Sequence, residues 1–195
     1  MREVFNTVWI ALLLAITAAP CAADDLKGVA LEPPYSLEID KSDRTLIVRH
    51  GKSLTRKFQI AVGRGGIGDK RIRGDNKTPL GVYHIAGFNE ESEFDLFMRL
   101  NYPNVKDAFF GLRNHLIGRR EFDAIVQAAR RNELPPQNTP LGGAVGIHGL
   151  GEETTERVKV QRHLDWTKGC IALSNRDVLE LRRYVDVGTR VTIRE

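Results

Sequence analysis

The sequence predicts a β-rich α+β fold in a single domain, with a sheet at its core and a few flanking helices. Three observations predict it. Apolar residues alternate with polar ones in several short runs, helical spacing recurs in only a few stretches, and turn-forming residues separate the runs. The chain has 195 residues, of which 42% are hydrophobic and 28% are charged, which is enough for a sizeable core and a charged surface.

Strands are predicted wherever apolar side chains recur at every second residue. Turn residues at 40–43 and 50–52 mark hairpin connections between the first three runs. The predicted strands lie around Leu37 and Ile39, around Leu46 and Val48, over Phe58, Ile60 and Val62, over residues 82–86 and 94–101, at the start of 144–151, and at Val191 and Ile193.

Helices are predicted over residues 107–115 and 121–131, and from Ser174 or Asn175 to about Tyr184. In the second of these, apolar residues fall on one face at helical spacing. The third begins with a Ser174 that can cap it, three residues before Asp177.

Two long loops separate these elements. Residues 63–81 are rich in glycine and charge, but no GK[ST] closes the segment and no helical pattern follows it, so we expect a structural loop rather than a phosphate cradle. Residues 134–143 are rich in helix- and strand-breaking residues.

The N-terminus predicts export. A positive Arg2, an apolar run over residues 8–19 and small residues before Asp24 form a signal-peptide pattern over residues 1–23, followed by a linker over 24–34 and the domain over 35–195. We therefore expect a periplasmic or secreted, envelope-associated protein. An uncleaved anchor or acylation at Cys21 remains an alternative, and either would be the chain's one link to a membrane.

The distribution of charge and the spacing of the histidines argue against nucleic-acid binding and against a metal site. The net charge is +4, but the basic residues are scattered and form no basic helix or aromatic platform, so no nucleic-acid partner is expected. His50, His84 and His115 show no metal-ligand spacing, and neither a metal nor another cofactor is predicted.

Cys170 is the cysteine that remains after cleavage of residues 1–23. A lone thiol in an oxidising compartment is either a buried, inert side chain or a reactive one. His148 precedes it by 22 residues, and both residues lie where strands are predicted to end, so an imidazole and a thiol can meet at one edge of a sheet. The glycines beside them, Gly169 and Gly149, leave backbone N–H groups accessible for a developing oxyanion, and the Cys170 N–H is expected to act together with that of Gly169.

These residues resemble the L,D-transpeptidase family with a YkuD-type catalytic domain. That family carries a His-Gly pair, a spacer, and Ser/Thr-x-Gly-Cys followed by a hydrophobic residue and usually an arginine. The matching stretches here are IHG at 147–149, TKGCI at 167–171, GDNKTPLGVYHI at 74–85, LNYPN at 100–104 and VDVGTRVTI at 185–193.

The resemblance implies a mixed-strand sheet core, similar to a β-sandwich or barrel, and a two-step acyl transfer on peptidoglycan stem peptides. Cys170 would attack the carbonyl of the diamino acid in a tetrapeptide stem, and His148 would carry the proton. One departure stands out, because Ala172 occupies the position of the usual arginine. A hydrolase on the same scaffold, cutting for example a link between peptidoglycan and a lipoprotein, is therefore an alternative. A catalytically silent wall-binding module is a further one.

Four more residues are candidates for substrate binding. Thr167 matches a family position and is expected to hydrogen-bond near the histidine. Lys168 is a candidate for lowering the thiol pKa if it shares a strand face with Cys170, with a solvated surface charge as the alternative. Trp166 is a candidate pocket wall, with core packing as the alternative. His163 is a candidate pocket residue, with a surface position as the alternative.

Overall fold

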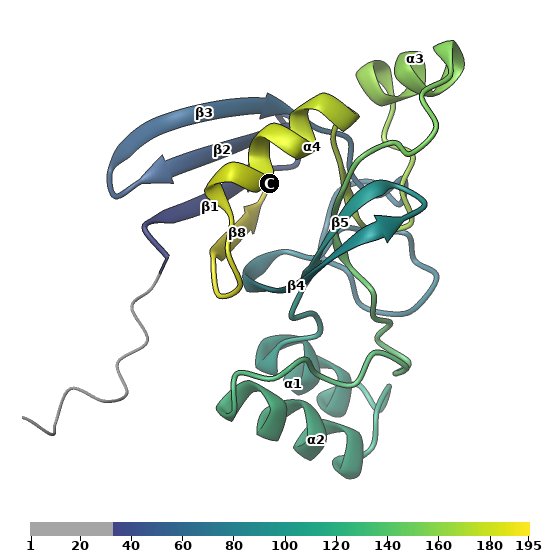
Figure 1. Cartoon of the computed structure of the whole chain (residues 1–195). Helices are drawn as coiled ribbons and strands as arrows, with labels where there is room; N and C mark the ends of the chain where they lie inside the picture. Colours follow the sequence, from purple (N-terminus) through teal and green to yellow (C-terminus); the bar gives the residue numbers. More distant parts are fainter. Residues whose placement is uncertain (1–32) are drawn as a thin grey trace, which may run out of the picture. The chain divides into compact units, whose positions relative to one another are not determined.

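A curled mixed sheet forms the core of the domain (Figure 1). The computed structural model describes residues 33–195, so the predicted signal peptide and nearly all of the linker lie outside the described residues. In order along the chain, the elements are β1 (Tyr35–Asp40), β2 (Thr45–His50), β3 (Ser53–Gln59), β4 (Gly81–Ser92), β5 (Asp95–Leu100), α1 (Val105–Arg113), α2 (Arg119–Arg130), β6 (Gly146–His148), α3 (Thr155–His163), β7 (Ile171–Ala172), α4 (Asn175–Leu181), the 3-10 helix η1 (Arg182–Tyr184) and β8 (Arg190–Arg194).

The eight strands of the sheet run in the order β3-β2-β1-β8-β4-β5-β6-β7. The pairs β1–β8 and β6–β7 are parallel, and the other neighbours are antiparallel. The β-rich α+β fold class is therefore confirmed. The last strand of the chain, β8, fills the middle of the sheet and joins the first hairpins to the β4–β5 hairpin.

The main core lies between the sheet and α4. Its strand residues are those at every second position, such as Leu37 and Ile39 of β1, which are fully buried. Val178 and Leu181 of α4 complete this core, and the Ser174 hydroxyl caps the helix by accepting a hydrogen bond from the Asp177 N–H at 3.1 Å.

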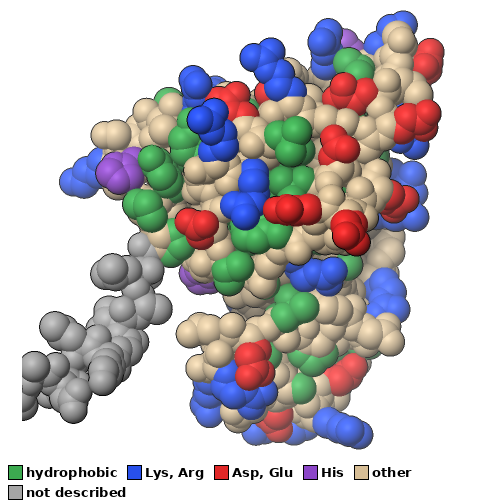
Figure 2. Space-filling model, in the orientation of Figure 1, with side chains coloured by type: hydrophobic (Ala, Val, Ile, Leu, Met, Phe, Trp, Pro, Cys, Tyr) green, Lys and Arg blue, Asp and Glu red, His purple; other side chains and the backbone are tan. Residues whose placement is uncertain are grey.

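The pair α1 and α2 packs around a second, smaller cluster and lies at the opposite end of the domain from α3 (Figure 1). Both helices were predicted, with bounds shifted by about one to two residues, as is usual for helix ends. Within residues 33–195 no helix combines the length and the apolar character needed to cross a bilayer. On the face seen in Figure 2, acidic and basic side chains are interspersed.

Several predicted bounds were wrong. The third strand ends at Gln59; Ile60 and Val62 are buried but follow the strand, and Ala61 there forms an isolated bridge with Ala172. The strand predicted at the start of 144–151 is limited to the three residues of β6. Neither α3 nor the two-residue β7 was predicted. The apolar residues of α3 are confined to two valines, so the helix shows no apolar stripe.

Candidate active site

The site is built on three short neighbouring strands, β5, β6 and β7. Met98, Ile147 and Ile171 stand side by side across these strands and are all buried in the main core. Because side chains alternate between the two faces of a sheet, this buried row forces the residues before and after it onto the opposite face.

That opposite face presents two rows of three residues. The strand register defines the first row directly, and the second row follows by continuing the β6–β7 register one residue before Ile171. The backbone N–H of Gly146 lowers the pKa of Cys170, which agrees with this placement. The first row is Phe97, His148 and Ala172, and the second is Arg99, Gly146 and Cys170.

His148 and Cys170 are therefore diagonal neighbours. With about 4.8 Å between strands and about 6.6 Å for two residues along a strand, their Cα atoms lie about 8 Å apart. Both side chains line one cavity of about 540 Å³. His148 is 3% exposed, whereas Cys170 is partly exposed.

The expectation that both residues follow strands was half right. His148 is the last residue of β6, but Cys170 immediately precedes β7. The two residues still meet, because strands of three and two residues are so short that the end of one lies beside the start of its parallel neighbour.

The imidazole of His148 is held in one tautomer. Its Nδ1 lies 2.6 Å from the carbonyl oxygen of Gly149, which can only accept a hydrogen bond, so Nδ1 carries the proton. The other nitrogen, Nε2, then keeps a lone pair and can act as a base. Aromatic rings surround the imidazole: Phe94 at 4.3 Å, Trp166 edge-on at 5.9 Å and Phe97 stacked at 6.1 Å between centroids.

Burial makes both groups less willing to ionise. It lowers the pKa of His148, against the Gly149 carbonyl and the charge of Glu93. It raises the pKa of Cys170, against the Gly146 N–H and the charges of Lys70 and Arg99. Both shifts favour the neutral thiol and the neutral imidazole over the ionised pair.

A tight turn presents Cys170. The Thr167 hydroxyl donates to the Cys170 carbonyl at 2.7 Å and accepts from the Gly169 N–H at 3.1 Å. Gly169 has φ +129°, and a Cβ there would lie 2.8 Å from the Lys77 carbonyl oxygen, so no other residue fits. Thr167 thus holds the cysteine turn and not the histidine, contrary to expectation.

Neither glycine N–H predicted to face an oxyanion is free to do so. The Gly169 N–H bonds Thr167, and the Gly149 N–H bonds the Leu96 carbonyl of β5 at 3.3 Å. Among residues 33–195, no hydrogen bond engages the Cys170 N–H. The Cys170 N–H is therefore the backbone donor left at the site.

The 63–81 loop supports this turn, as a structural loop should. Thr78 accepts from the Gly63 N–H at 2.8 Å, and its hydroxyl lies 3.5 Å from the Cys170 carbonyl. Asp75 organises the same loop by accepting from Lys70 at 2.8 Å and from the Arg71 N–H at 2.7 Å. Burial opposes its ionisation, but these hydrogen bonds lower the pKa of Asp75 overall.

The β4–β5 hairpin supplies one wall of the cavity, which sequence reasoning missed. Alternation in β5 carries the signal, since Leu96, Met98 and Leu100 are buried and Phe97 and Arg99 must face the other way. The lining residues that were not predicted are Arg64, Asn89, Ser92, Glu93, Phe94, Phe97, Arg99 and Ala144.

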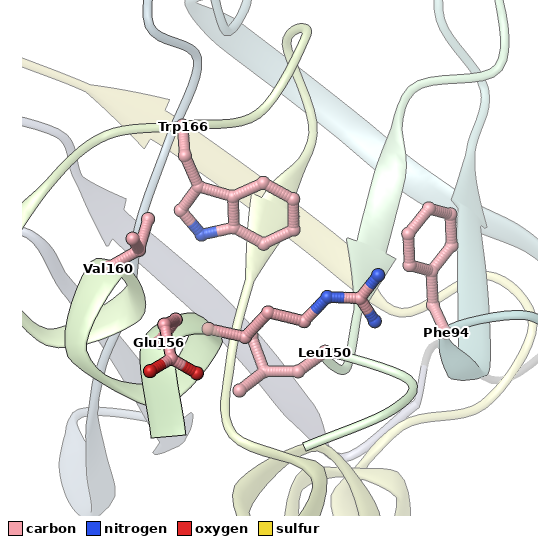
Figure 3. A pocket seen from close by; sticks show the side chains of 6 residues that line it. Phe94, Leu150, Glu156, Val160 and Trp166 are labelled. Atoms are coloured by element: carbon pink, nitrogen blue, oxygen red, sulfur yellow. The ribbon is translucent and has the colours of Figure 1, made fainter. Parts of the chain in front are cut away.

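Trp166 lines the cavity, as one of its two predicted roles requires. Its indole N–H donates to Gln161 at 2.9 Å, and the Gln161 amide donates to the Ala172 carbonyl at 2.7 Å, which ties α3 to β7. Phe94 and Trp166 also wall an apolar pocket of about 220 Å³ beside the cavity. Figure 3 shows these two rings on different sides of that pocket, with Leu150 near its base.

The remaining candidates are dispersed. Lys168 is exposed and lines the cavity, but residues 168–170 form no strand, and the cations that lower the thiol pKa are Lys70 and Arg99. His163 is exposed at the end of α3 and lines neither pocket. In the described part of the chain, no group of three His, Cys, Asp or Glu side chains is placed to hold a metal ion.

The fold and this cavity define a domain with a buried histidine and a cysteine on one sheet face. The family model of the L,D-transpeptidase catalytic domain, YkuD, matches residues 34–193. The chain belongs to this family.

Relatives agree with this assignment. YafK of Escherichia coli strain K12, a candidate L,D-transpeptidase, is 27% identical over 123 residues, which cover 52% of this chain and 50% of YafK. The chain thus spans about half the length of the curated relatives that it matches.

Solved structures show the same fold. The helical cell shape determining protein Pgp2 of Campylobacter jejuni superimposes with a TM-score of 0.53 at 24% identity, over 83% of this chain and 47% of Pgp2. Bd1075 of Bdellovibrio bacteriovorus gives 0.51 at 21% identity, over 84% of this chain and 48% of that protein.

Thr167→Val is expected to lower the free energy of unfolding by about 2–4 kcal/mol, because it leaves the buried Gly169 N–H without an acceptor and removes the shorter of the two hydroxyl hydrogen bonds to the Cys170 carbonyl. Thr167→Ser keeps the hydroxyl and is expected to lose only about 1 kcal/mol for the missing methyl group. Urea unfolding of both variants measures the difference. A valine variant as stable as the serine variant would remove the hydroxyl from this role.

The rate at which iodoacetamide alkylates Cys170 is expected to keep rising as the pH passes 9.0, the ordinary pKa of a thiol. Burial raises the pKa of Cys170, so little thiolate is present at neutral pH. Mass spectrometry of the peptide that contains Cys170 follows this residue separately from Cys21. A fast rate that levels off below pH 7 would instead indicate a resting thiolate paired with an imidazolium.

Proposed function

We propose that this chain is a cysteine L,D-transpeptidase that transfers acyl groups on peptidoglycan stem peptides. The observation that carries the proposal is the placement of His148 and Cys170 on one face of adjacent parallel strands, lining one cavity. The His148 tautomer adds to it, since Nε2 is left as the proton acceptor. Family membership supplies the reaction class.

In the first half-reaction, the sulfur of Cys170 attacks the carbonyl carbon of the diamino acid, typically meso-diaminopimelate, in a tetrapeptide stem. His148 Nε2 takes the thiol proton as the C–S bond forms, which fits a pair that is neutral at rest. The Cys170 N–H, which no hydrogen bond engages within residues 33–195, would stabilise the oxyanion. The C–N bond then breaks, and the imidazolium protonates the departing amine. The terminal D-Ala is released, and the rest of the stem remains bound to Cys170 as a thioester.

In the second half-reaction, an amine attacks the carbonyl carbon of the thioester, and His148 accepts a proton from this amine. Collapse of the tetrahedral intermediate forms the new amide, and the thiolate leaves and recovers the proton from the imidazolium. The acceptor is an amine on a neighbouring stem, on a lipoprotein or on a free D-amino acid. The chain needs no cofactor for these steps.

Hydrolysis on the same scaffold is the second candidate, and Ala172 is the observation that favours it. The usual family arginine is replaced here by a methyl group that is fully buried beside His148 in the first row. With water as the acceptor, the enzyme would trim stems or release a lipoprotein linked through diaminopimelate. A wall-binding module without turnover is the third reading.

The proposal places this chemistry outside the cytoplasmic membrane. It relies on residues 1–23 acting as a signal peptide, with 24–34 as a linker and 35–195 as the catalytic domain. An uncleaved or lipidated N-terminus would tether the same domain to the membrane.

Replacing His148 by glutamine is expected to slow the conversion of purified muropeptides by about 10²–10⁴-fold, because the proton acceptor is lost. Cys170→Ser is expected to abolish conversion. Incubating the full chain with muropeptides and separating the products by mass spectrometry measures both effects. Products joined through two diaminopimelate residues indicate transfer, and shortened stems indicate hydrolysis.

His50→Gln is the matched control, since His50 lies on β2 and lines neither pocket. Full conversion by the His148 variant would assign the base to another residue. Binding of sacculi by the wild-type chain with no change in any muropeptide would favour the silent module.

A further inference from the structure

Three cations line the active-site cavity without an anionic partner. Arg64, Arg99 and Lys168 are among its lining residues, and no ion pair or side-chain hydrogen bond engages them within residues 33–195. Glu93 is the acidic residue of the same lining. The cavity is therefore suited to an anionic group of the substrate.

Arg99 is the unpaired cation closest to the nucleophile in the strand register. It stands in the second row with Gly146 of β6 and with Cys170, which immediately precedes β7. Two strand spacings of about 4.8 Å separate the backbone of Arg99 from that of Cys170. Lys70 also acts on the thiol, but it is already engaged by Asp75 at 2.8 Å and by the Ile72 carbonyl at 3.0 Å.

Gly146 stands between Arg99 and Cys170 in this row and carries no side chain. A Cβ at this position would lie 2.5 Å from the Phe97 ring and 2.6 Å from the Met98 carbonyl oxygen, so a side chain cannot be accommodated. The guanidinium of Arg99 lies 5.6 Å from the centre of the Phe97 ring, on the cavity side of the sheet. The Phe97 ring covers Gly146 itself, but Arg99 and Cys170 both line the cavity. A small anion bound by Arg99 would therefore share this cavity with the sulfur.

The stem peptide carries such an anion close to the bond that breaks. In a tetrapeptide stem, the α-carboxylate of the leaving amino acid lies three bonds from the carbonyl carbon that the sulfur attacks. Guanidinium and carboxylate groups match each other in a planar, two-bond arrangement.

We propose that Arg99 is a specificity-determining residue that binds the free α-carboxylate of the amino acid that leaves the donor peptide. The inference rests on the proposed function and refines its substrate class. Donors that end one residue beyond the scissile carbonyl fit this site. A leaving amine on a lysine side chain, as in a lipoprotein link, places its carboxylate several bonds farther away and loses the contact.

The test compares two donors that differ in one charge: a stem tetrapeptide with a free C-terminal carboxylate and the same peptide as a C-terminal amide. The full-length wild-type chain is expected to prefer the free acid in kcat/KM. Arg99→Met is expected to reduce that preference by about 10- to 100-fold, the range for a hydrogen bond to a charged group. Arg99→Lys keeps the charge without the planar fork and is expected to lie between the two.

The ratio of the two donors isolates binding from activation of the thiol. Loss of Arg99 also removes a charge that lowers the pKa of Cys170, but this slows both donors equally. Arg130→Met is the matched control, because it removes an exposed arginine of α2 that does not line the cavity and is expected to leave the ratio unchanged.

Two outcomes would overturn the inference in different ways. A wild-type ratio in folded Arg99→Met, with folding checked by circular dichroism, would show that Arg99 does not read the carboxylate while leaving the proposed function intact. Consumption of neither donor by the wild-type chain, with Cys170 unmodified, would instead remove the proposed function itself.

Discussion

The register of three short strands is the constraint on which the site depends. Met98, Ile147 and Ile171 must stay buried together, and a slip of one residue would turn every neighbouring side chain to the opposite face. This register alone brings His148 and Cys170 onto one face, although 22 residues separate them in the sequence. The hydrophobic core therefore positions polar chemistry that lies just outside it.

The same burial sets the electrostatic character of the pair. It lowers the pKa of His148 and raises that of Cys170, so it favours the neutral form of each group. The tautomer of His148 is fixed because its Nδ1–H donates to the Gly149 carbonyl. The neutral imidazole therefore keeps a lone pair on Nε2, which can accept a proton. The charges of Lys70 and Arg99 act against this burial and lower the pKa of Cys170.

Local patterns in the sequence predicted the β-rich fold, most of the strands and helices, and the family through motifs around His148 and Cys170. They failed where a tertiary contact decides the structure. Helix α3 is anchored by the buried amide of Gln161, which donates a hydrogen bond to the Ala172 carbonyl. Its sequence has no apolar stripe from which a helix could be predicted. The engagement of the Gly169 N–H by Thr167 depends on a turn that spacing cannot specify. Arg99 was not predicted as a site residue, because its neighbours in the sheet lie on strands that are distant in the sequence. Alternation in β5 indicated only which face of the sheet it occupies.

Trapping a covalent intermediate on the sulfur of Cys170 would test most directly whether this cysteine is the nucleophile. The full chain is mixed with a tetrapeptide stem, quenched in acid within the first turnover, digested and weighed by mass spectrometry. The account predicts that the peptide containing Cys170 gains the mass of the stem acyl group without its terminal D-Ala. Turnover with this peptide unmodified, or with the acyl group attached to another residue, would contradict it.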